Sequence, residues 1–279
     1  MAYSLHLYPV EVRPQGSDVA FVDGVRRIDA RLVLDTDEGP VPGLCGSRAV
    51  GAVVWRREVP ESEVISATVE RIAVLAAGHS PRLPPLPPAL DYRPQSVAET
   101  DPAALVRTFH DGMRRSEAVL TEELAQGGYF VVADGPLYEY TDAPKVGFIK
   151  SHRRSYLEGE AGSLIGRLPA GHRTPLFAIG EGRFRRYSWY IRLADPDMGP
   201  AWGGIARCEA SAAPGLDDAV VVADRSASVL PLVASEPHID PRAPQNLVPI
   251  AALERDLRHR MGDAGLAYRE LRAAIAMAA

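Results

Sequence analysis

Two aspartates occupy matching places in the sequence, each after a short apolar run and directly before a glycine. Asp23 follows residues 19–22, and Asp134 follows residues 129–133. A carboxylate at the end of a buried strand is held rigidly, and a neighbouring glycine lets a backbone, an ion or a phosphate approach closely. The pair therefore points to a bound divalent cation, although Asp-Gly is also a common turn signal.

A glutamate on a predicted helix is the third candidate ligand. The helix is predicted to begin at Thr100-Asp101-Pro102, a capping residue followed by proline, and to end at Gly127-Gly128. At about 100° per residue, Glu117 falls at the edge of the apolar stripe, from where it can reach strand-end carboxylates. Three converging carboxylates are typical of Mg²⁺ or Mn²⁺ sites. Glu123 lies on the other margin of the stripe, and periodicity alone does not choose between the two.

A basic segment covers residues 145–192. It contains ten lysines and arginines against three glutamates, a local charge of +7 in a chain whose net charge is −5. Aromatic residues are interleaved with the basic ones, so the segment favours capture of phosphates and stacking on unpaired bases. A solvated charged face over core aromatics is the alternative. The arginines expected to hold a nucleic-acid backbone are Arg153, Arg154, Arg183, Arg185 and Arg186.

A proline-stiffened loop at residues 235–246 carries two further candidate ligands. His238 and Asp240 are two residues apart, just before the last predicted helix. Either side chain could complete a metal site. The alternative is a rigid loop in which Asp and Asn bond the local backbone.

Composition and motifs exclude several other classes of protein. The chain has 279 residues, 46% of them apolar and 24% charged, which indicates a folded protein with a substantial core. Two cysteines exclude a disulfide framework and a four-thiolate zinc site, and they favour the reducing cytoplasm. Neither a membrane-spanning run nor a secretory leader is recognisable. The phosphate-binding GxxxxGK[ST], the dinucleotide-binding GxGxxG and the GxSxG elbow are absent from the sequence.

The elements that must position these residues alternate between strands and helices. Strands are predicted at 19–22, 28–34 and 50–55, with a loop over 35–47 and an ambiguous segment at 64–75. Six prolines between Pro81 and Pro94 predict an extended connector at about 80–95. Further strands are predicted at 129–133, 176–179, 187–193 and 203–210. Helices are expected in part of 143–157 and over 216–233 and 250–278. The order is typical of an α/β fold, a mixed sheet covered by helices, in a single domain over residues 1–279.

Three short motifs resemble those of the NurA nucleases. They are Val22-Asp23-Gly24, Asp134-Gly135-Pro136-Leu137 and Phe148-Ile149-Lys150. Each motif is weak alone, but their order and spacing match over residues 19 to 272. The resemblance implies an RNase H-like core with extra strands and a C-terminal helix. It also implies Mn²⁺- or Mg²⁺-dependent resection of DNA ends, and dimers that work with the hexameric ATPase HerA.

The same resemblance assigns roles residue by residue. Asp23 and Asp134 match the two aspartate ligands, Glu117 matches the helix glutamate, and Lys150 matches a basic residue near the active site. The family's final ligand is a histidine at the start of a late helix, and here Ile250 or its neighbours fall at that place, with His238 or Asp240 as nearby substitutes. This departure leaves a second hypothesis open, a non-catalytic adaptor that binds DNA or the ATPase. A nuclease that acts on RNA is a third.

Overall fold

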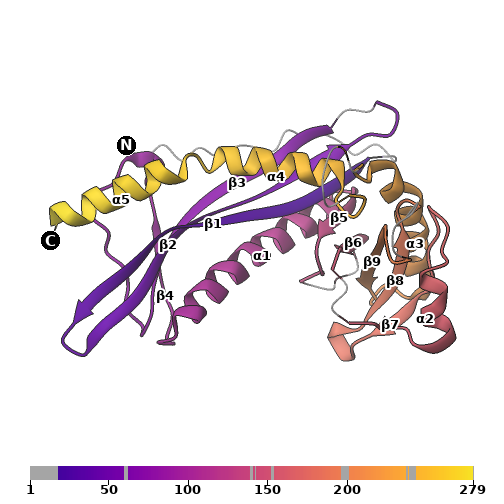
Figure 1. Ribbon diagram of the computed structural model, residues 1–279, viewed down its shortest axis with the longest axis horizontal. Coiled ribbons are helices and arrows are strands. Elements are labelled where there is room, and N and C mark those ends of the chain that lie inside the picture. Colours follow the sequence, from indigo (N-terminus) through magenta and orange to yellow (C-terminus); the bar gives the residue numbers. More distant parts are fainter. Residues whose placement is uncertain are drawn as a thin grey trace. The chain divides into compact units, whose positions relative to one another are not determined.

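The computed structural model describes residues 18–59, 62–138, 141, 143–151, 154–195, 201–236, 238 and 243–278. The strands are β1 (Val19–Thr36), β2 (Gly39–Trp55), β3 (Ser62–Leu75), β4 (Arg93–Ser96), β5 (Phe130–Asp134), β6 (Lys145–Ile149), β7 (Phe177–Ile179), β8 (Arg186–Arg192) and β9 (Ile205–Ser211). The helices are α1 (Pro102–Gln126), α2 (Gly159–Ile165), α3 (Leu216–Val229), α4 (Val248–Arg260) and α5 (Ala264–Ala278), with short 3₁₀ turns η1 (Pro88–Leu90), η2 (Gly182–Phe184) and η3 (Leu230–Val233) (Figure 1).

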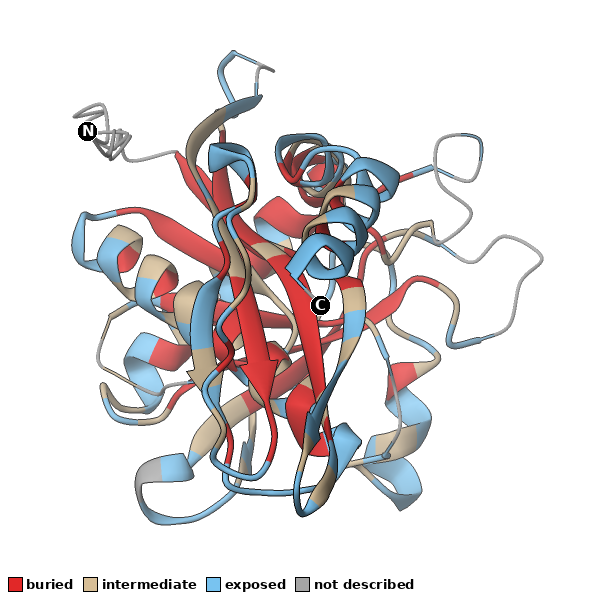
Figure 2. Ribbon diagram, turned by 90° about the vertical axis from the view of Figure 1, so that its left-hand side faces the viewer, coloured by how far each residue is buried: buried red, intermediate tan, exposed pale blue. Residues whose placement is uncertain are grey.

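The strands form one mixed sheet in the order β4-β3-β2-β1-β5-β6-β9-β8-β7. β5 is parallel to both β1 and β6, whereas β9 is antiparallel to β6 and β8. This mixture of directions with covering helices confirms the predicted α/β class. Buried residues are concentrated in the strands, and the outer faces of the helices are exposed (Figure 2).

The chain divides into two compact units. Unit 1 comprises residues 1–23, 52–66 and 118–253, and unit 2 comprises residues 24–51, 67–117 and 254–279. Three strands and two helices run through both units: β1, β2, β3, α1 and α4. The expectation of a single domain over 1–279 remains a prediction.

In unit 1 the two faces of the sheet are covered by different helices. On one face, the end of α1 packs through Leu124 and Ala125 on Val22 and Val131. On the other face α3 contacts β6, β8 and β9, and the buried Trp189 donates a hydrogen bond from Nε1 to Ser226 Oγ at 3.1 Å. A buried core on both faces therefore holds β5, β6 and the part of β1 that pairs with β5.

In unit 2, α1 and α5 also cover opposite faces. Leu105 and Phe109 of α1 pack in a cluster with Leu44 and Val74, whereas Leu271 of α5 packs with Cys45, Ala73 and Tyr92. Because successive strand residues point to opposite faces, the alternation of 44 with 45 and of 73 with 74 produces the two layers. The start of α1 is as predicted, because Asp101 Oδ1 accepts a hydrogen bond from the N–H of Ala103 at 2.9 Å.

Several predicted segments are wrong and one ambiguity is resolved. The strands predicted at 19–22 and 28–34 are one continuous strand, β1, so Asp23 lies within a strand and not at its end. Residues 39–47, predicted as a loop from their glycines and prolines, are the first half of β2, and Lys145–Ile149, expected to be partly helical, is the buried strand β6. The ambiguous 64–75 lies in β3. The proline-rich connector contributes β4, which lies at the sheet edge where proline is tolerated. The predicted last helix is two helices, separated at Gly262 with φ +74°. Among the described residues, none of the helices is both long enough and apolar enough to cross a membrane.

Candidate metal centre

The parallel pairing of β1 with β5 aligns the two predicted aspartates. Val22 is paired with Ala133, so that Asp23 and Asp134 come next on neighbouring strands, and side chains at equivalent positions of a parallel pair point to the same face. Asp23 is 7% exposed and the Asp134 side chain is 14% exposed. Two partly dehydrated carboxylates therefore lie together where β5 ends.

A third carboxylate joins them from α4. Oxygen atoms of Asp23, Asp134 and Glu254 all lie within 4.8 Å of one another. Ile250 and Leu253 of α4 are fully buried and fix the rotation of this helix about its axis. Glu254 is the residue directly after Leu253. Glu254 also forms an ion pair with Arg258, whose Nη2 lies 3.2 Å from Glu254 Oε2. Like charges this close repel, so the arrangement favours a bound cation.

The donor set suits a hard divalent cation. All three groups offer carboxylate oxygen, the ligand preferred by Mg²⁺ and Mn²⁺, and this cluster contains no thiolate or imidazole. The residues present therefore fit the metal that the family resemblance implies.

Lys150 lies beside the cluster at the end of β6. Its Nζ donates to Asp134 Oδ2 at 2.7 Å and to Asn246 Oδ1 at 3.1 Å. Asn246 is fully buried, and its carbonyl accepts the N–H of Ser235. A lysine held between two oxygen acceptors has its ammonium group fixed in direction.

Glu117 lies against the residue that follows Asp23. A Cβ built on Gly24 would collide with Glu117 Oε1 and would lie 3.1 Å from Met113 Cγ. Glycine at position 24 is therefore what allows the α1 carboxylate to come down onto β1. Glu123, the alternative left open by periodicity, is exposed to solvent.

The late loop does not bring its predicted ligand to the cluster. His238 has an exposed side chain whose Nδ1 lies 3.3 Å from Glu236 Oε2, and it is not a member of the carboxylate group found among the described residues. Asp240 lies outside the described residues. Its predicted role as a ligand remains a prediction.

The basic segment contains two kinds of arginine. Arg154 and Arg185 are exposed, and Arg154 lies over the ring of Tyr156, 5.5 Å from its centroid. Arg186, by contrast, donates from Nε to the buried Glu209 at 3.0 Å. Arg153 and the side chain of Arg183 lie outside the described part. The exposed pair is thus better placed for phosphate contacts than Arg186.

The two cysteines are unsuited to nucleophilic chemistry. Burial, and to a lesser extent the charge of Asp29, raises the pKa of the Cys45 thiol to about 12. Burial likewise raises the pKa of Cys208 well above its usual range. Both thiols therefore stay protonated at neutral pH, whereas the reactive form of cysteine is the thiolate.

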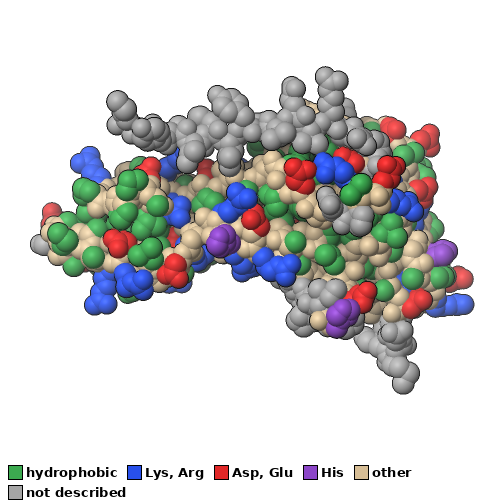
Figure 3. Space-filling view, turned by 90° about the horizontal axis from the view of Figure 1, so that it is seen from above, with side chains coloured by type: hydrophobic (Ala, Val, Ile, Leu, Met, Phe, Trp, Pro, Cys, Tyr) green, Lys and Arg blue, Asp and Glu red, His purple; other side chains and the backbone are tan. Residues whose placement is uncertain are grey.

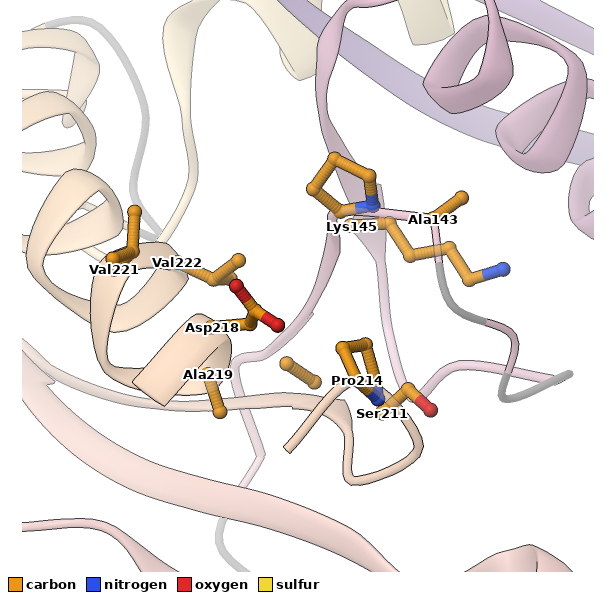
Figure 4. Close-up of a pocket in the computed structure, with 10 residues that line it drawn as sticks. Ala143, Lys145, Ser211, Pro214, Asp218, Ala219, Val221 and Val222 are labelled. Atoms are coloured by element: carbon orange, nitrogen blue, oxygen red, sulfur yellow. The ribbon is translucent and has the colours of Figure 1, made fainter. Parts of the chain in front are cut away.

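A cavity of about 270 Å³ in unit 1 lies away from the carboxylates. It is lined by residues at the start of β6 and the first turns of α3, among them Pro144, Lys145 and Asp218 (Figure 4). The ammonium group of Lys145 points away from α3, toward Glu122 and Thr141, which accept its hydrogen bonds. The cavity lies at the start of β6, whereas Asp134 and Lys150 lie where β5 and β6 end, about 15 Å farther along β6 by strand geometry. The cavity is therefore not part of the candidate centre.

Two residues of the site were not singled out in the sequence. Glu254 lies four residues after Ile250, the position to which the family resemblance assigned the final ligand, and one helical turn on the same face is the signal that could have identified it. Asn246 was visible only as part of a proline-rich loop.

Comparison with known proteins supports the fold. No protein-family model and no curated protein matches the chain. Among solved structures, the NurA nuclease from Sulfolobus solfataricus superimposes with a TM-score of 0.51 at 10% identity, covering 88% of this chain and 82% of that one. The catalytic domain of human Endonuclease V matches with a TM-score of 0.34 at 15% identity, covering 90% and 89%. The resemblance inferred from the motifs is therefore confirmed at the level of the fold, and the chain has a NurA-like fold.

Proposed function

We propose that this protein is a metal-dependent nuclease that hydrolyses phosphodiester bonds in DNA. The observation that carries the proposal is the meeting of three carboxylates, from β1, β5 and α4, within 4.8 Å. They come from segments separated by more than a hundred residues, and two of them belong to the motifs that resemble NurA. The NurA-like fold supports the same reading.

In this proposal Asp23, Asp134 and Glu254 hold Mn²⁺ or Mg²⁺, and Glu117 is a further ligand implied by the family resemblance. A bound divalent ion would supply an activated water and neutralise charge on the leaving oxygen. Lys150, fixed by Asp134 and Asn246, supplies positive charge to the phosphate. Arg154 and Arg185 hold the DNA backbone at its negative charges.

The finer parts of the proposal come from the family resemblance. We propose that the protein resects DNA ends, forms a homodimer and works with a HerA-type hexameric ATPase. The two buried thiols are compatible with work in the cytoplasm. Activity on labelled duplex DNA with and without such an ATPase tests the partnership.

A cleavage assay with a matched control tests the proposal. Labelled single- and double-stranded DNA are incubated with Mn²⁺ and with wild type, Asp134→Asn or Asp217→Asn. Asp217 is an exposed aspartate of α3 and serves as the control. Loss of several kcal/mol of transition-state stabilisation predicts a fall of about 10³-fold for Asp134→Asn alone. Equal cleavage by all three proteins would refute the proposal. Calorimetry with Mn²⁺ separates a nuclease from a non-catalytic adaptor, because a degenerate site does not bind the ion.

A further inference from the structure

The turn that follows Asp134 lies flat against the neighbouring strand. Gly135 has φ +97°, a conformation that favours glycine, and its N–H donates to the carbonyl of Phe148 at 2.7 Å. A Cβ on Gly147 of β6 would be 3.0 Å from both Gly135 O and Leu137 N. The path of the chain immediately after Asp134 is therefore fixed by contacts with β6.

A buried glutamate on β9 holds the other side of this turn. Glu209 is paired with Gly147 in the antiparallel ladder, and its side chain is fully buried. Its Oε1 accepts a hydrogen bond from the N–H of Leu137 at 3.0 Å. Because Gly147 has no side chain, the carboxylate can pass over it to reach the turn.

Two arginines compensate the buried charge of Glu209. Its Oε2 accepts from Arg186 Nε at 3.0 Å and from Arg207 Nη1 at 2.9 Å. Arg207 is itself fixed by Ser188 Oγ at 3.0 Å and by the ring of Tyr156, whose centroid lies 4.9 Å from its Cζ. A buried carboxylate is costly unless it is paired and hydrogen-bonded, and these partners meet that condition.

We infer that Glu209 is a positioning residue for the metal centre, acting through the turn that carries Asp134. This inference rests on the proposed function. The two oxygens of Glu209 have different partners: Oε1 accepts from Leu137 N–H, and Oε2 accepts from the two arginines. Arg186, whose predicted contact with DNA remains a prediction, orients Glu209.

Two substitutions separate positioning from simple stabilisation. Glu209→Gln keeps an oxygen that can accept from Leu137 N but removes the charge that pairs with the arginines. Glu209→Asp keeps the charge but is one methylene too short to reach the turn. Positioning through Leu137 predicts that Glu209→Asp weakens Mn²⁺ binding about 10-fold, as the loss of an outer partner commonly does, whereas Glu209→Gln stays within about threefold of wild type. A purely structural role predicts the reverse order, because the unpaired arginines make Glu209→Gln the less stable protein.

The measurements are Mn²⁺ affinity by calorimetry, thermal unfolding, and hydrogen exchange of the Leu137 amide in the full chain. Faster exchange and weaker Mn²⁺ binding in Glu209→Asp, with both nearly unchanged in Glu209→Gln, are expected. An exchange rate at Leu137 that is the same in Glu209→Asp as in wild type overturns the inference. So does a result in which the variant with the lower unfolding temperature is also the one that binds Mn²⁺ more weakly, with Glu209→Gln the weaker of the two. If Glu209→Gln does not fold, the Glu209→Asp measurements alone decide. If wild type fails to bind Mn²⁺, the proposed function is wrong. The amide exchange still tests the hydrogen bond between Leu137 N–H and Glu209 Oε1 in that case.

Discussion

At the scale of single residues, the close approach of Asp23, Asp134 and Glu254 has an electrostatic cost. Two unit charges at about 5 Å repel by about 3 kcal/mol at an effective dielectric constant of about 20. Lys150 offsets part of this cost through Asp134. The cluster is therefore a place where stability is given up until a cation binds.

Replacing Glu254 by glutamine tests that balance. Without divalent ions we expect Glu254→Gln to unfold at a higher temperature than wild type, because one repelling charge is gone and the ion pair with Arg258 that is lost is partly exposed. With Mn²⁺ at about 100 times its dissociation constant, wild type should gain about 2.7 kcal/mol, and the variant much less. Thermal unfolding with and without Mn²⁺ measures both effects.

The control is Glu123→Gln, which removes an exposed glutamate from α1. It should change neither the unfolding temperature nor the response to Mn²⁺. A wild-type response in Glu254→Gln would show that this glutamate is not a ligand.

The residue scale also shows how far a sequence can identify a site. Asp134 follows a short apolar run, and its predicted place at the end of a strand is confirmed. Asp23 was expected at a strand end as well, but it lies inside the 18-residue β1. The strand that ends just before Lys150 was not predicted. Glu254 is followed by two more charged residues on a helix, and only the packing of Leu253 and Leu257 decides which of them faces inward. Asn246 becomes informative only when its contact with Lys150 is known.

At the scale of elements, an ion pair ties the last turns of α1 to the start of β6. The buried ammonium of Lys145 donates to Glu122 Oε2, and Thr141 Oγ1 donates to the same oxygen at 2.6 Å. Burial alone would raise the pKa of Glu122, but the hydrogen bonds from Lys145, Thr141 and Gln126 outweigh it and lower the pKa. The pair therefore stabilises the fold at neutral pH, when the carboxylate is charged.

Removal of that carboxylate should have a pH-dependent cost. Glu122→Gln leaves the buried Lys145 without its charged partner, and we expect a loss of about 1–3 kcal/mol at pH 7. Because the folded pKa is lowered, the contribution is present above the unfolded value of about 4.3 and is lost as the pH falls through the folded pKa. Urea unfolding at pH 7 and near pH 3 should therefore show a gap between variant and wild type that closes in acid. A gap of the same size at both values would contradict the assignment.

A different element explains why one prediction was wrong. Glycine and proline at 39–47 suggested a loop, yet Gly46 lies in β2 beneath Phe109 of α1, where a Cβ would come 2.6 Å from the ring. The glycine is required by the helix above it, a long-range contact that local sequence rules do not contain. β6 was misjudged for a related reason, since five buried residues are too few to show periodicity.

Gly46→Ala tests the packing of α1 on the sheet of unit 2. The added methyl group meets the Phe109 ring, and overpacking of this kind costs about 1–3 kcal/mol. Adding Phe109→Leu to Gly46→Ala should recover part of that loss, so that a double-mutant cycle of unfolding free energies gives a coupling above about 0.5 kcal/mol. Strictly additive effects would mean that the two residues do not press on each other.

At the scale of the whole molecule, the charge distribution determines how the proposed DNA substrate would bind. The net charge is −5, and acidic and basic side chains are interspersed over the face in Figure 3. A protein of this kind has little general attraction for DNA, so phosphate binding must come from a few local cations. Within the basic segment, several arginines are already used inside the fold: Arg192, for example, is 1% exposed and donates to the carbonyls of Gly166, Leu168, Ala201 and Gly203.

The salt dependence of binding should therefore report few contacts, and Arg154 and Arg185 should provide a measurable share of them. Each phosphate contact contributes about 0.7 to the slope of log K against log salt for single strands, so Arg154→Gln with Arg185→Gln should flatten the slope by about 1.4. Arg107→Gln, an exposed arginine of α1 in unit 2, is the control and should leave the slope unchanged. Fluorescence anisotropy of a labelled oligonucleotide, measured from 50 to 200 mM salt with Ca²⁺ in place of Mn²⁺ to prevent cleavage, gives the slopes. If the double variant keeps the wild-type slope, the exposed arginines of the basic segment do not contact the backbone, and the path of DNA to Asp134 must be sought on another part of the surface.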